Sequence, residues 1–247
     1  QKIMDTAASV NLVSRDQIQE GQAQANLSES LVRVPGLYAL NRQNYAQDLQ
    51  ISSRGFGANS TFGARGLRIL VDGIPGTVAD GQGQISHIDL ASADHIEVLR
   101  GPFSVLYGNA SGGVISVFTE KGQPGLQLTP YFETGSYGLR KYGLKVTGEQ
   151  DGINYVLNTG KLESTGYRQH SAATRDNTNA KLGFTLSTGT QVQLVANQVD
   201  LSAQDPLGLT AAQLQQNRTQ PGNFALAYDT RKTMRQTQGG MVLTHAF

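Results

Sequence analysis

Residues 94–121 read DHIEVLRGPFSVLYGNASGGVISVFTEK, and this stretch decides the fold. The apolar residues of 95–99 predict a strand, which the Gly-Pro dipeptide at 101–102 ends. A short helical turn follows. The Gly-Gly pair at 112–113 then permits backbone angles and close approaches that a Cβ would forbid. The apolar run at 114–118 predicts a second strand, so the stretch folds as strand, turn, helical turn, glycine pair and strand.

Two earlier segments carry related patterns. Residues 51–57 read ISSRGFG, a strand that ends in a glycine-rich turn. Residues 68–75 read RILVDGIP, a strand followed by an Asp-Gly turn and a proline that fixes the exit. Together the three segments resemble the plug domain of TonB-dependent outer-membrane receptors. Three ordered motifs over about seventy residues are far more specific than a single glycine pattern.

The resemblance implies an α+β plug domain followed by antiparallel transmembrane β-barrel strands, a fragment of a plugged barrel of about 22 strands. It implies a receptor in the outer membrane of a Gram-negative bacterium that binds a scarce small molecule outside and imports it to the periplasm. TonB would be the energising partner that acts on the plug. No enzymatic activity, cofactor or nucleic-acid partner is implied.

The composition of the 247 residues is compatible with this class. The chain has no Cys, which excludes disulfides and thiolate metal sites. Its net charge of +1 gives no electrostatic basis for nucleic-acid binding. No apolar run reaches the ~18 residues of a transmembrane helix, but barrel strands are short and alternate in polarity.

Residues 1–122 are predicted to form the plug domain. Ser14 is expected to cap a helix, with Gln17 three residues later completing a capping box. A second helix is expected through residue 34, where the Pro-Gly pair at 35–36 stops it. Strands are expected at 9–13, 50–53, 67–71, 95–99 and 114–118.

Residues 123–247 are predicted to form the opening strands of the barrel. From residue 125 apolar and polar residues alternate in segments of roughly nine to twelve residues, which is typical of transmembrane barrel strands. A soluble antiparallel sheet gives the same alternation. Short turns facing the periplasm should alternate with long loops facing outside. The turns are expected at 150–152 and 187–189, and the long polar loops at 165–177 and 204–231.

Other motifs favour structural interpretations. The glycine-rich segment 54–57 lacks the Lys-Ser/Thr of a phosphate-binding loop, which favours a turn packed closely against a wall. Asp72 has no evident acid, base or metal partner and is interpreted as a turn residue. The four histidines lack helical metal-ligand spacing, and no Gly-x-Ser-x-Gly motif is present. We therefore expect no catalytic residue and no metal site.

The expected size of the barrel implies further segments outside this sequence. An eight-stranded barrel has room only for its own side chains, whereas a plugged lumen belongs to barrels of about 22 strands. About six strands are expected here, so roughly sixteen should lie elsewhere. The TonB-contact box is expected upstream of Gln1. Alone, 1–122 should fold as a soluble unit, whereas 123–247 should not, because its edges and lipid face would be open.

Within the family, the segments NRQNYAQDLQ at 41–50 and DGQGQ at 80–84 resemble receptors for pyrroloquinoline quinone. Both segments would be loops at the plug apex that face the ligand. Arg42 would pair with a carboxylate and Tyr45 would stack on a planar ring. The glutamines of 80–84 would donate to carbonyl groups. The predicted ligand-binding residues are Arg42, Gln43, Asn44, Tyr45, Phe62, Gln82 and Gln84.

Arg54 and Arg100 are predicted to form a plug–barrel latch with wall carboxylates beyond residue 247, a contact that plug movement would break. Three alternatives stay open. The polar apex residues could be merely solvated. A ferric siderophore receptor shares every plug motif and should differ by more aromatic residues in the apex loops. A soluble β-rich binding module accounts for the alternation but not for the three plug motifs.

Overall fold

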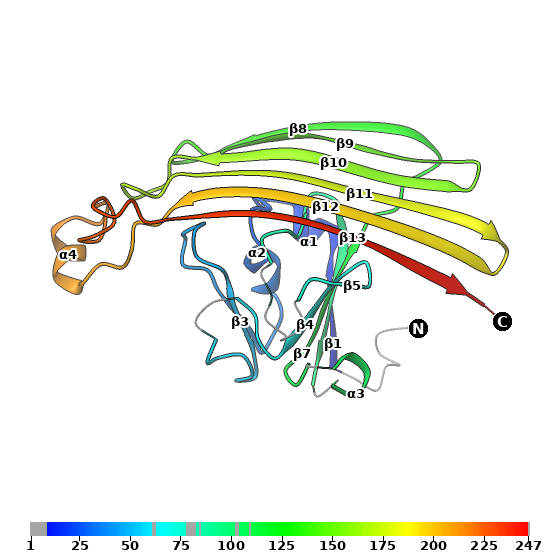
Figure 1. Cartoon of the computed structure of the whole chain (residues 1–247), viewed down its shortest axis with the longest axis horizontal. Helices are drawn as coiled ribbons and strands as arrows, with labels where there is room; N and C mark the ends of the chain where they lie inside the picture. Colours follow the sequence, from blue (N-terminus) through cyan, green and yellow to red (C-terminus); the bar gives the residue numbers. More distant parts are fainter. Residues whose placement is uncertain are drawn as a thin grey trace.

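The computed structural model of the chain describes residues 9–60, 63–77, 83, 85–101, 104–108 and 110–246. The fold has two parts. A plug is built around a five-stranded mixed sheet and a separate two-stranded sheet, and a curved wall of six antiparallel strands lies across it (Figure 1). No helix in these ranges combines the length and apolarity needed to cross a membrane.

The plug contains all five strands that the sequence predicts for it. In its main sheet the order is β1-β6-β7-β4-β5, where β4 and β7 are parallel and the other neighbours are antiparallel. The sequence did not predict β2, which pairs with β3. The plug elements are β1 (Ser9–Ser14), α1 (Arg15–Gln19), α2 (Ser28–Leu31), β2 (Leu37–Leu40), β3 (Gln50–Ser53), β4 (Leu67–Val71), β5 (Ile74–Pro75), β6 (Ala93–Arg100), α3 (Ser104–Tyr107) and β7 (Gly113–Thr119).

The two plug helices differ in how well the sequence predicted them. Ser14 caps α1, and its backbone N–H donates to Gln17 Oε1 at 3.0 Å, which confirms the capping box. In contrast, α2 ends at Leu31 and does not reach residue 34. Residue 34 precedes Pro35, and the residue before a proline is disfavoured in helical conformation.

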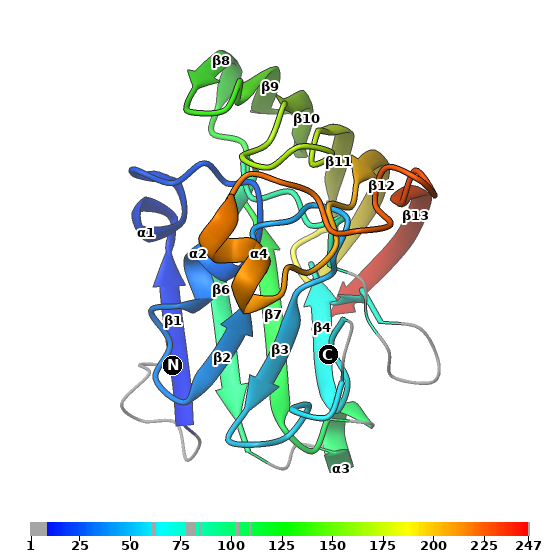
Figure 2. The ribbon, with the colours of Figure 1, turned by 90° about the vertical axis from the view of Figure 1, so that its left-hand side faces the viewer.

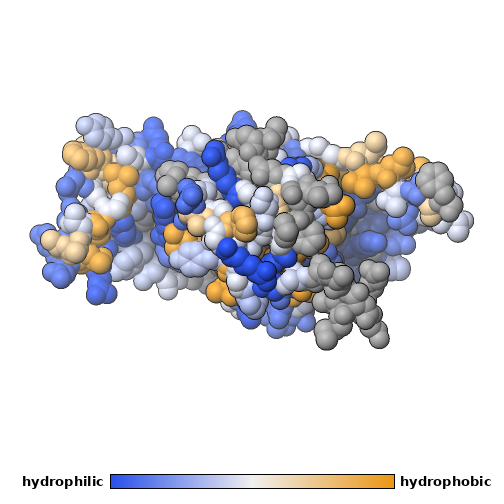
Figure 3. Space-filling view, turned by 90° about the horizontal axis from the view of Figure 1, so that it is seen from below, coloured by the Kyte–Doolittle hydropathy of each residue, from blue (hydrophilic) through white to orange (hydrophobic). Residues whose placement is uncertain are grey.

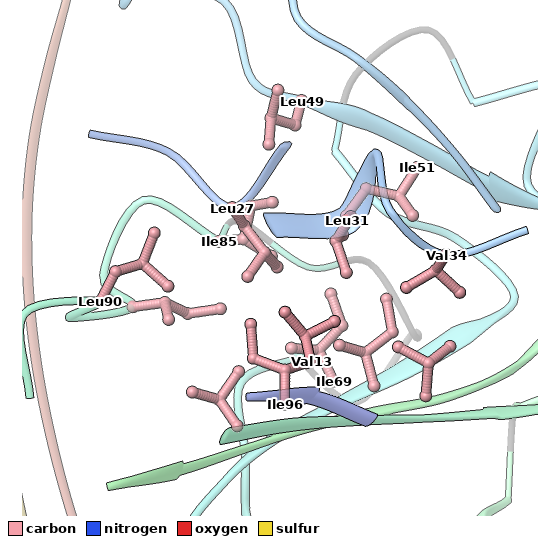
Figure 4. Close-up of a cluster of buried hydrophobic side chains, with 14 of the residues drawn as sticks. Val13, Leu27, Leu31, Val34, Leu49, Ile51, Ile69, Ile85, Leu90 and Ile96 are labelled. Carbon is pink, nitrogen blue, oxygen red and sulfur yellow. The ribbon is translucent and has the colours of Figure 1, made fainter. Parts of the chain in front are cut away.

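The plug core lies between the main sheet on one side and α2 with β3 on the other (Figure 4). Val13, Ile69 and Ile96 from the sheet face Leu31 and Ile51, and each exposes at most 2% of its surface. Burying one such side chain stabilises a fold by roughly 1.5–3 kcal/mol. All described residues of this core belong to the plug, and none comes from the wall.

The glycine pair at 112–113 has the close contacts that its sequence context predicts. Gly113 adopts φ +126°, and an added Cβ would collide with the carbonyl oxygen of Leu99 on β6. A Cβ on Gly112 would lie 2.8 Å from Phe56 Cβ, in the second motif of the sequence. The glycines therefore bring two of the three plug motifs into contact.

The wall strands pair in chain order, and short turns alternate with longer loops as predicted. The loop expected at 165–177 ends at residue 172, because Arg175 and Asn177 belong to a strand whose polar side contacts the plug. The helix α4 within the last loop was not predicted. The wall elements are β8 (Gly125–Thr134), β9 (Arg140–Gln150), β10 (Ile153–Ser164), β11 (Ala173–Ser187), β12 (Thr190–Gln204), α4 (Ala211–Gln216) and β13 (Arg231–His245).

The wall carries apolar side chains outside and polar side chains toward the plug. On β8, Leu126, Leu128 and Phe132 expose 64%, 61% and 67% of their surfaces. Lys145 on β9 and Lys181 on β11 are buried against the plug. This polarity is the reverse of that in a water-soluble sheet, and a sheet with a lipid-facing outer side requires it.

Candidate functional site

The loop at 41–49 joins β2 to β3 and lies at the end of the wall that carries the long loops (Figure 1). It carries four of the predicted ligand-binding residues. Arg42 and Gln43 are exposed, and Asn44 is half-buried. These three residues border a cleft of about 340 Å³ between the plug and the wall loops. The plug lines this cleft with Arg42, Gln43, Asn44 and Gln47, and the wall lines it with Tyr167, Arg168, Ser171, Asp205, Pro206, Leu207 and Gly208. We call this space the apex cleft.

Asp205 connects the two sides of the apex cleft. Its carboxylate is nearly buried and accepts a hydrogen bond from Asn44 Nδ2 at 2.8 Å and another from Gln47 Nε2. A third bond comes from the backbone N–H of Leu207 at 2.9 Å. Beside it, Lys232 on β13 forms an ion pair with Asp48 of the plug loop at 2.6 Å. The apex loop is therefore fastened to the wall by polar contacts.

Tyr45 points to a different place from the other predicted residues. Its ring packs against a small apolar cluster on the wall that includes Leu201 and Met234. Burial raises the pKa of the Tyr45 phenol, the nearby Glu29 carboxylate raises it further, and Arg175 opposes the shift. The side chain thus lies at the seam between plug and wall and does not line the apex cleft.

Arg168 organises the wall loops that border the apex cleft. Its guanidinium donates to the carbonyl oxygens of Pro206, Leu207 and Gln220 at 2.6–3.0 Å, and the backbone N–H of Gln169 donates to Thr219 O at 2.8 Å. These bonds join the loop at 165–172 to the loop at 205–230. The sequence analysis missed this residue, because a single arginine in a polar loop has no distinguishing pattern.

The loop at 205–230 extends beyond the plug at the loop end of the wall (Figure 1). Seen from the loop end of the wall, α4 stands in front of the plug strands (Figure 2). From below the plug, hydrophobic side chains gather around this loop, at the left of Figure 3. Phe224, Leu226 and Tyr228 contribute large exposed apolar surfaces. Residues 205–208 of this loop line the apex cleft, whereas its large apolar side chains lie on an exposed surface.

The remaining predicted residues are far from this cleft or outside the described ranges. Phe62, Gln82 and Gln84 lie outside the described residues. Arg54 and Arg100 both approach Gly36 at the turn before β2, where Arg100 Nη1 donates to Pro35 O. Within the described ranges neither arginine forms an ion pair. Their role as a latch stays a prediction.

The plug and the wall instead meet through a polar interface that the sequence did not predict. Lys181 lies 3.0 Å from Asp72 and also donates to Thr119 O at 2.8 Å. Lys145 pairs with Glu120 at 2.6 Å. Here the plug supplies the carboxylates and the wall supplies the cations, the opposite of the predicted latch. Asp72 is a turn residue as expected, with φ +50°, but its carboxylate also joins plug to wall.

Hydrogen bonds from asparagine and arginine side chains of the wall extend the same interface. Asn158 on β10 donates to Asp89 at 2.8 Å, and Asn179 on β11 donates to Ser92 Oγ at 3.1 Å. Arg175 donates to the carbonyl oxygen of Ala25 at 2.8 Å. In the part of the chain that the structure describes, no cluster of three or more His, Cys, Asp or Glu residues could hold a metal ion. The described contacts between plug and wall are thus a mixture of ion pairs and hydrogen bonds.

Comparison with known proteins agrees with the fold. Residues 2–114 match the family model of the TonB-dependent receptor plug domain. The chain is 30% identical over 237 residues to the iron-regulated outer membrane virulence protein of Vibrio cholerae, covering 83% of this chain and 32% of that protein. It is 32% identical over 120 residues to the vitamin B12 transporter BtuB of Vibrio vulnificus, covering 48% of this chain and 19% of that protein.

Among solved structures, the ferric citrate transporter FecA in its unliganded form matches with a TM-score of 0.78 at 23% identity. The match covers 98% of this chain and 38% of that chain. The chain thus consists of a TonB-dependent receptor plug domain followed by the first strands of its barrel, and it spans between 19% and 38% of the length of these relatives. It is an outer-membrane component of a Gram-negative bacterium, in a family of transporters rather than enzymes.

Proposed function

We propose that this chain forms the plug and first wall strands of a receptor that imports a small extracellular molecule when TonB acts on the plug. The apex cleft carries this proposal, because plug and wall build it together at the loop end. A ligand in this cleft would contact both the plug, which would move, and the wall, which would stay in place. The plug domain is proposed to extend to about residue 122 and the wall to begin there.

The proposed ligand is pyrroloquinoline quinone, a planar acid with three carboxyl groups. The volume of the cleft, about 340 Å³, falls in the lower range of small-molecule sites. Arg42 supplies a cation at its border for one carboxylate, and Gln43 and Asn44 supply amide groups for the others. Phe62, Gln82 and Gln84 are kept as proposed contacts. Tyr45 supports the site by holding the apex loop against the wall, and its stacking role is proposed only for a ligand that reaches this seam.

A ferric siderophore is the second candidate. The relatives support it, because they include an iron-regulated outer membrane protein and a ferric citrate transporter. The lining of the cleft supports it less, because Tyr167 is the one aromatic residue among the described residues that border the cleft. Siderophore binding would support the proposed receptor function with a ferric siderophore as the ligand instead of the quinone.

Isothermal titration of the full-length receptor in detergent tests the ligand. We expect pyrroloquinoline quinone to bind with submicromolar affinity and a panel of ferric siderophores not to bind. Arg42→Ala should weaken quinone binding about tenfold, as expected for losing one charge-assisted contact. Arg33→Ala is the matched control, because this exposed plug arginine does not line the cleft.

Three outcomes separate the candidates. Quinone binding that depends on Arg42 but not on Arg33 supports the proposed ligand. Siderophore binding without quinone binding rejects the quinone and supports the second candidate. Equal losses in both arginine variants would show that the plug responds to general charge, which rejects the apex cleft as the binding site.

A further inference from the structure

Asp205 stands at the base of the loop at 205–230. Its backbone N–H donates to Thr230 O at 2.8 Å, and Thr230 Oγ1 donates to Asp205 O at 2.7 Å. These two bonds close the base of the loop, so the position of Asp205 is set by the wall. The side chains that hold its carboxylate, Asn44 and Gln47, belong to the plug. We call this contact the Asp205 tie.

The tie uses the donors that an acidic ligand would need. Asn44 Nδ2 and Gln47 Nε2 both donate to Asp205, and Asn44 Oδ1 is held by the backbone N–H of Ala46 at 2.9 Å. The guanidinium of Arg168 donates to backbone carbonyl oxygens of the wall loops. A ligand carboxylate that reaches Asn44 or Gln47 in the apex cleft therefore has to share these amide donors with Asp205. Two carboxylates at such short range repel each other.

From this geometry we propose that Asp205 senses acidic ligands. A carboxylate that enters the apex cleft takes over the amide donors of Asn44 and Gln47, displaces the Asp205 side chain, and releases the loop at 205–230 from the plug. The inference rests on the proposed function of the cleft and adds its regulation. The loop at 205–230 is fastened to the plug before an acidic ligand arrives and loosens when that ligand binds, whereas a neutral ligand of the same ring system leaves the loop fastened.

Hydrogen exchange of the full-length receptor in detergent measures the release directly. The probes are pyrroloquinoline quinone and its trimethyl ester, which has the same ring system without the acidic groups. We expect the free acid at saturation to speed exchange of the amides at 205–230 about tenfold, which corresponds to a typical coupling between two sites. The ester should leave the exchange unchanged, even at concentrations where it occupies the cleft.

The variant Asp205→Asn removes the negative charge at position 205 and keeps the hydrogen bonds of the Asp205 tie. Gln47 Oε1 is buried without a hydrogen-bond partner in the described structure, so it can accept from the amide introduced at position 205 after the Gln47 side chain turns over. The tie is then kept without the repulsion. We expect this variant to bind the quinone about tenfold more tightly and to show exchange at 205–230 that no longer depends on the quinone.

Asp229→Asn is the matched control. Asp229 lies at the other side of the same loop base, is half exposed, pairs with Arg231 and does not line the cleft. The control should retain wild-type affinity and wild-type exchange. Asp205→Ala tests the tie without any ligand, because loss of the carboxylate should speed exchange at 205–230 in the ligand-free receptor.

The outcomes are distinct for the sensor and for the proposed function. Ligand-free exchange that is unchanged in Asp205→Ala, or quinone affinity in Asp205→Asn that is no tighter than in the wild type, would overturn the sensor. A wild-type receptor that binds neither probe rejects the proposed ligand and the sensor with it. In that case faster exchange in Asp205→Ala would still identify the tie as a structural contact between plug and wall.

Discussion

Lys181 on β11 and Asp72 in the turn between β4 and β5 form an ion pair across the boundary between wall and plug. The distance between Lys181 Nζ and Asp72 Oδ1 is 3.0 Å, and the two side chains expose only 7% and 2% of their surfaces. Replacing such a buried pair by apolar residues is often neutral, but removing one partner leaves a buried charge without compensation. The ion pair therefore contributes more to the position of the plug relative to the wall than to the stability of either part.

Lys181→Met should destabilise the plug by roughly 3–5 kcal/mol, because it leaves the Asp72 carboxylate buried and unpaired. Urea denaturation of the full-length receptor, followed by protease accessibility of the plug, measures the loss. The double variant Asp72→Asn, Lys181→Met should recover most of it. Lys161→Met is the control, because this lysine lies on the outer face of the wall and pairs there with Glu163. An exposed ion pair of this kind stabilises a fold by at most about 1 kcal/mol. Equal losses in both lysine variants would contradict the prediction.

Gly113→Ala should prevent normal packing of the plug. The substitution places a Cβ against Leu99 O and keeps a backbone angle that side chains rarely adopt, so the cost should be about 3 kcal/mol or more. Protease resistance of the plug in isolated outer membranes measures the effect. Gly208→Ala has open space around the new Cβ and serves as the control. A protease-resistant Gly113→Ala plug would disprove the close approach of β6 and β7.

Glu29 should make the stability of the plug depend on pH. Burial raises the pKa of its carboxyl group above 4.5, and bonds from the backbone N–H groups of residues 24–26 oppose this shift. A raised pKa in the folded state means that the folded plug binds more protons. The contribution of the Glu29 carboxyl group to the stability of the plug is therefore complete below pH ~4.5, and it is lost as the pH rises through the pKa of the folded state.

The measurement for Glu29 is the difference in unfolding free energy between the wild type and Glu29→Gln from about pH 4 to pH 7. The wild type should lose stability relative to the variant as pH rises, and the variant removes this slope because its amide does not titrate. A difference that is constant over this range would show that the hydrogen bonds balance burial, and a change in the opposite direction would show that they outweigh it.

Arg168→Lys should loosen both wall loops, although the charge is kept. A lysine lacks the planar fork that reaches Pro206, Leu207 and Gln220 together, and each hydrogen bond from a charged group is worth about 1.5–3 kcal/mol. Hydrogen exchange at 165–172 and 205–230 should rise together. Arg218→Lys, in the same loop, should leave both segments unchanged. An increase confined to one segment would contradict the joint role of Arg168.

The sequence predicted those parts of the fold that local patterns determine. The capping box of Ser14 and Gln17, the strands of the plug motifs and the alternation of the wall are all confirmed. The end of α2 was missed because the conformational restriction before Pro35 outweighs the helical pattern. The short strand β2 and the helix α4 have no strong periodic signal.

The plug–wall contacts could not be predicted, because they join residues that are far apart in the chain. Lys181 and Asp72 are separated by 109 positions, and Asn44 and Asp205 by 161. In the sequence, Lys181 is one polar residue of an alternating strand, and only the position of the plug shows that it is buried beside a carboxylate. The predicted residues Arg42, Gln43 and Asn44 border the same cleft because they share one loop, and their role in ligand binding stays a prediction. Asp205 and Arg168 come from other loops and carry no motif.

The contact of Tyr45 with the apolar cluster of the wall has a consequence for affinity. Ordering a flexible loop during binding costs roughly 0.5–1.5 kcal/mol for each side chain that becomes fixed, and this cost is subtracted from the interaction energy. Tyr45 and Asp48 already hold the apex loop at the wall in the absence of a ligand. A molecule that enters the cleft would meet an apex loop that is already ordered, so less of the interaction energy would be spent on fixing this loop.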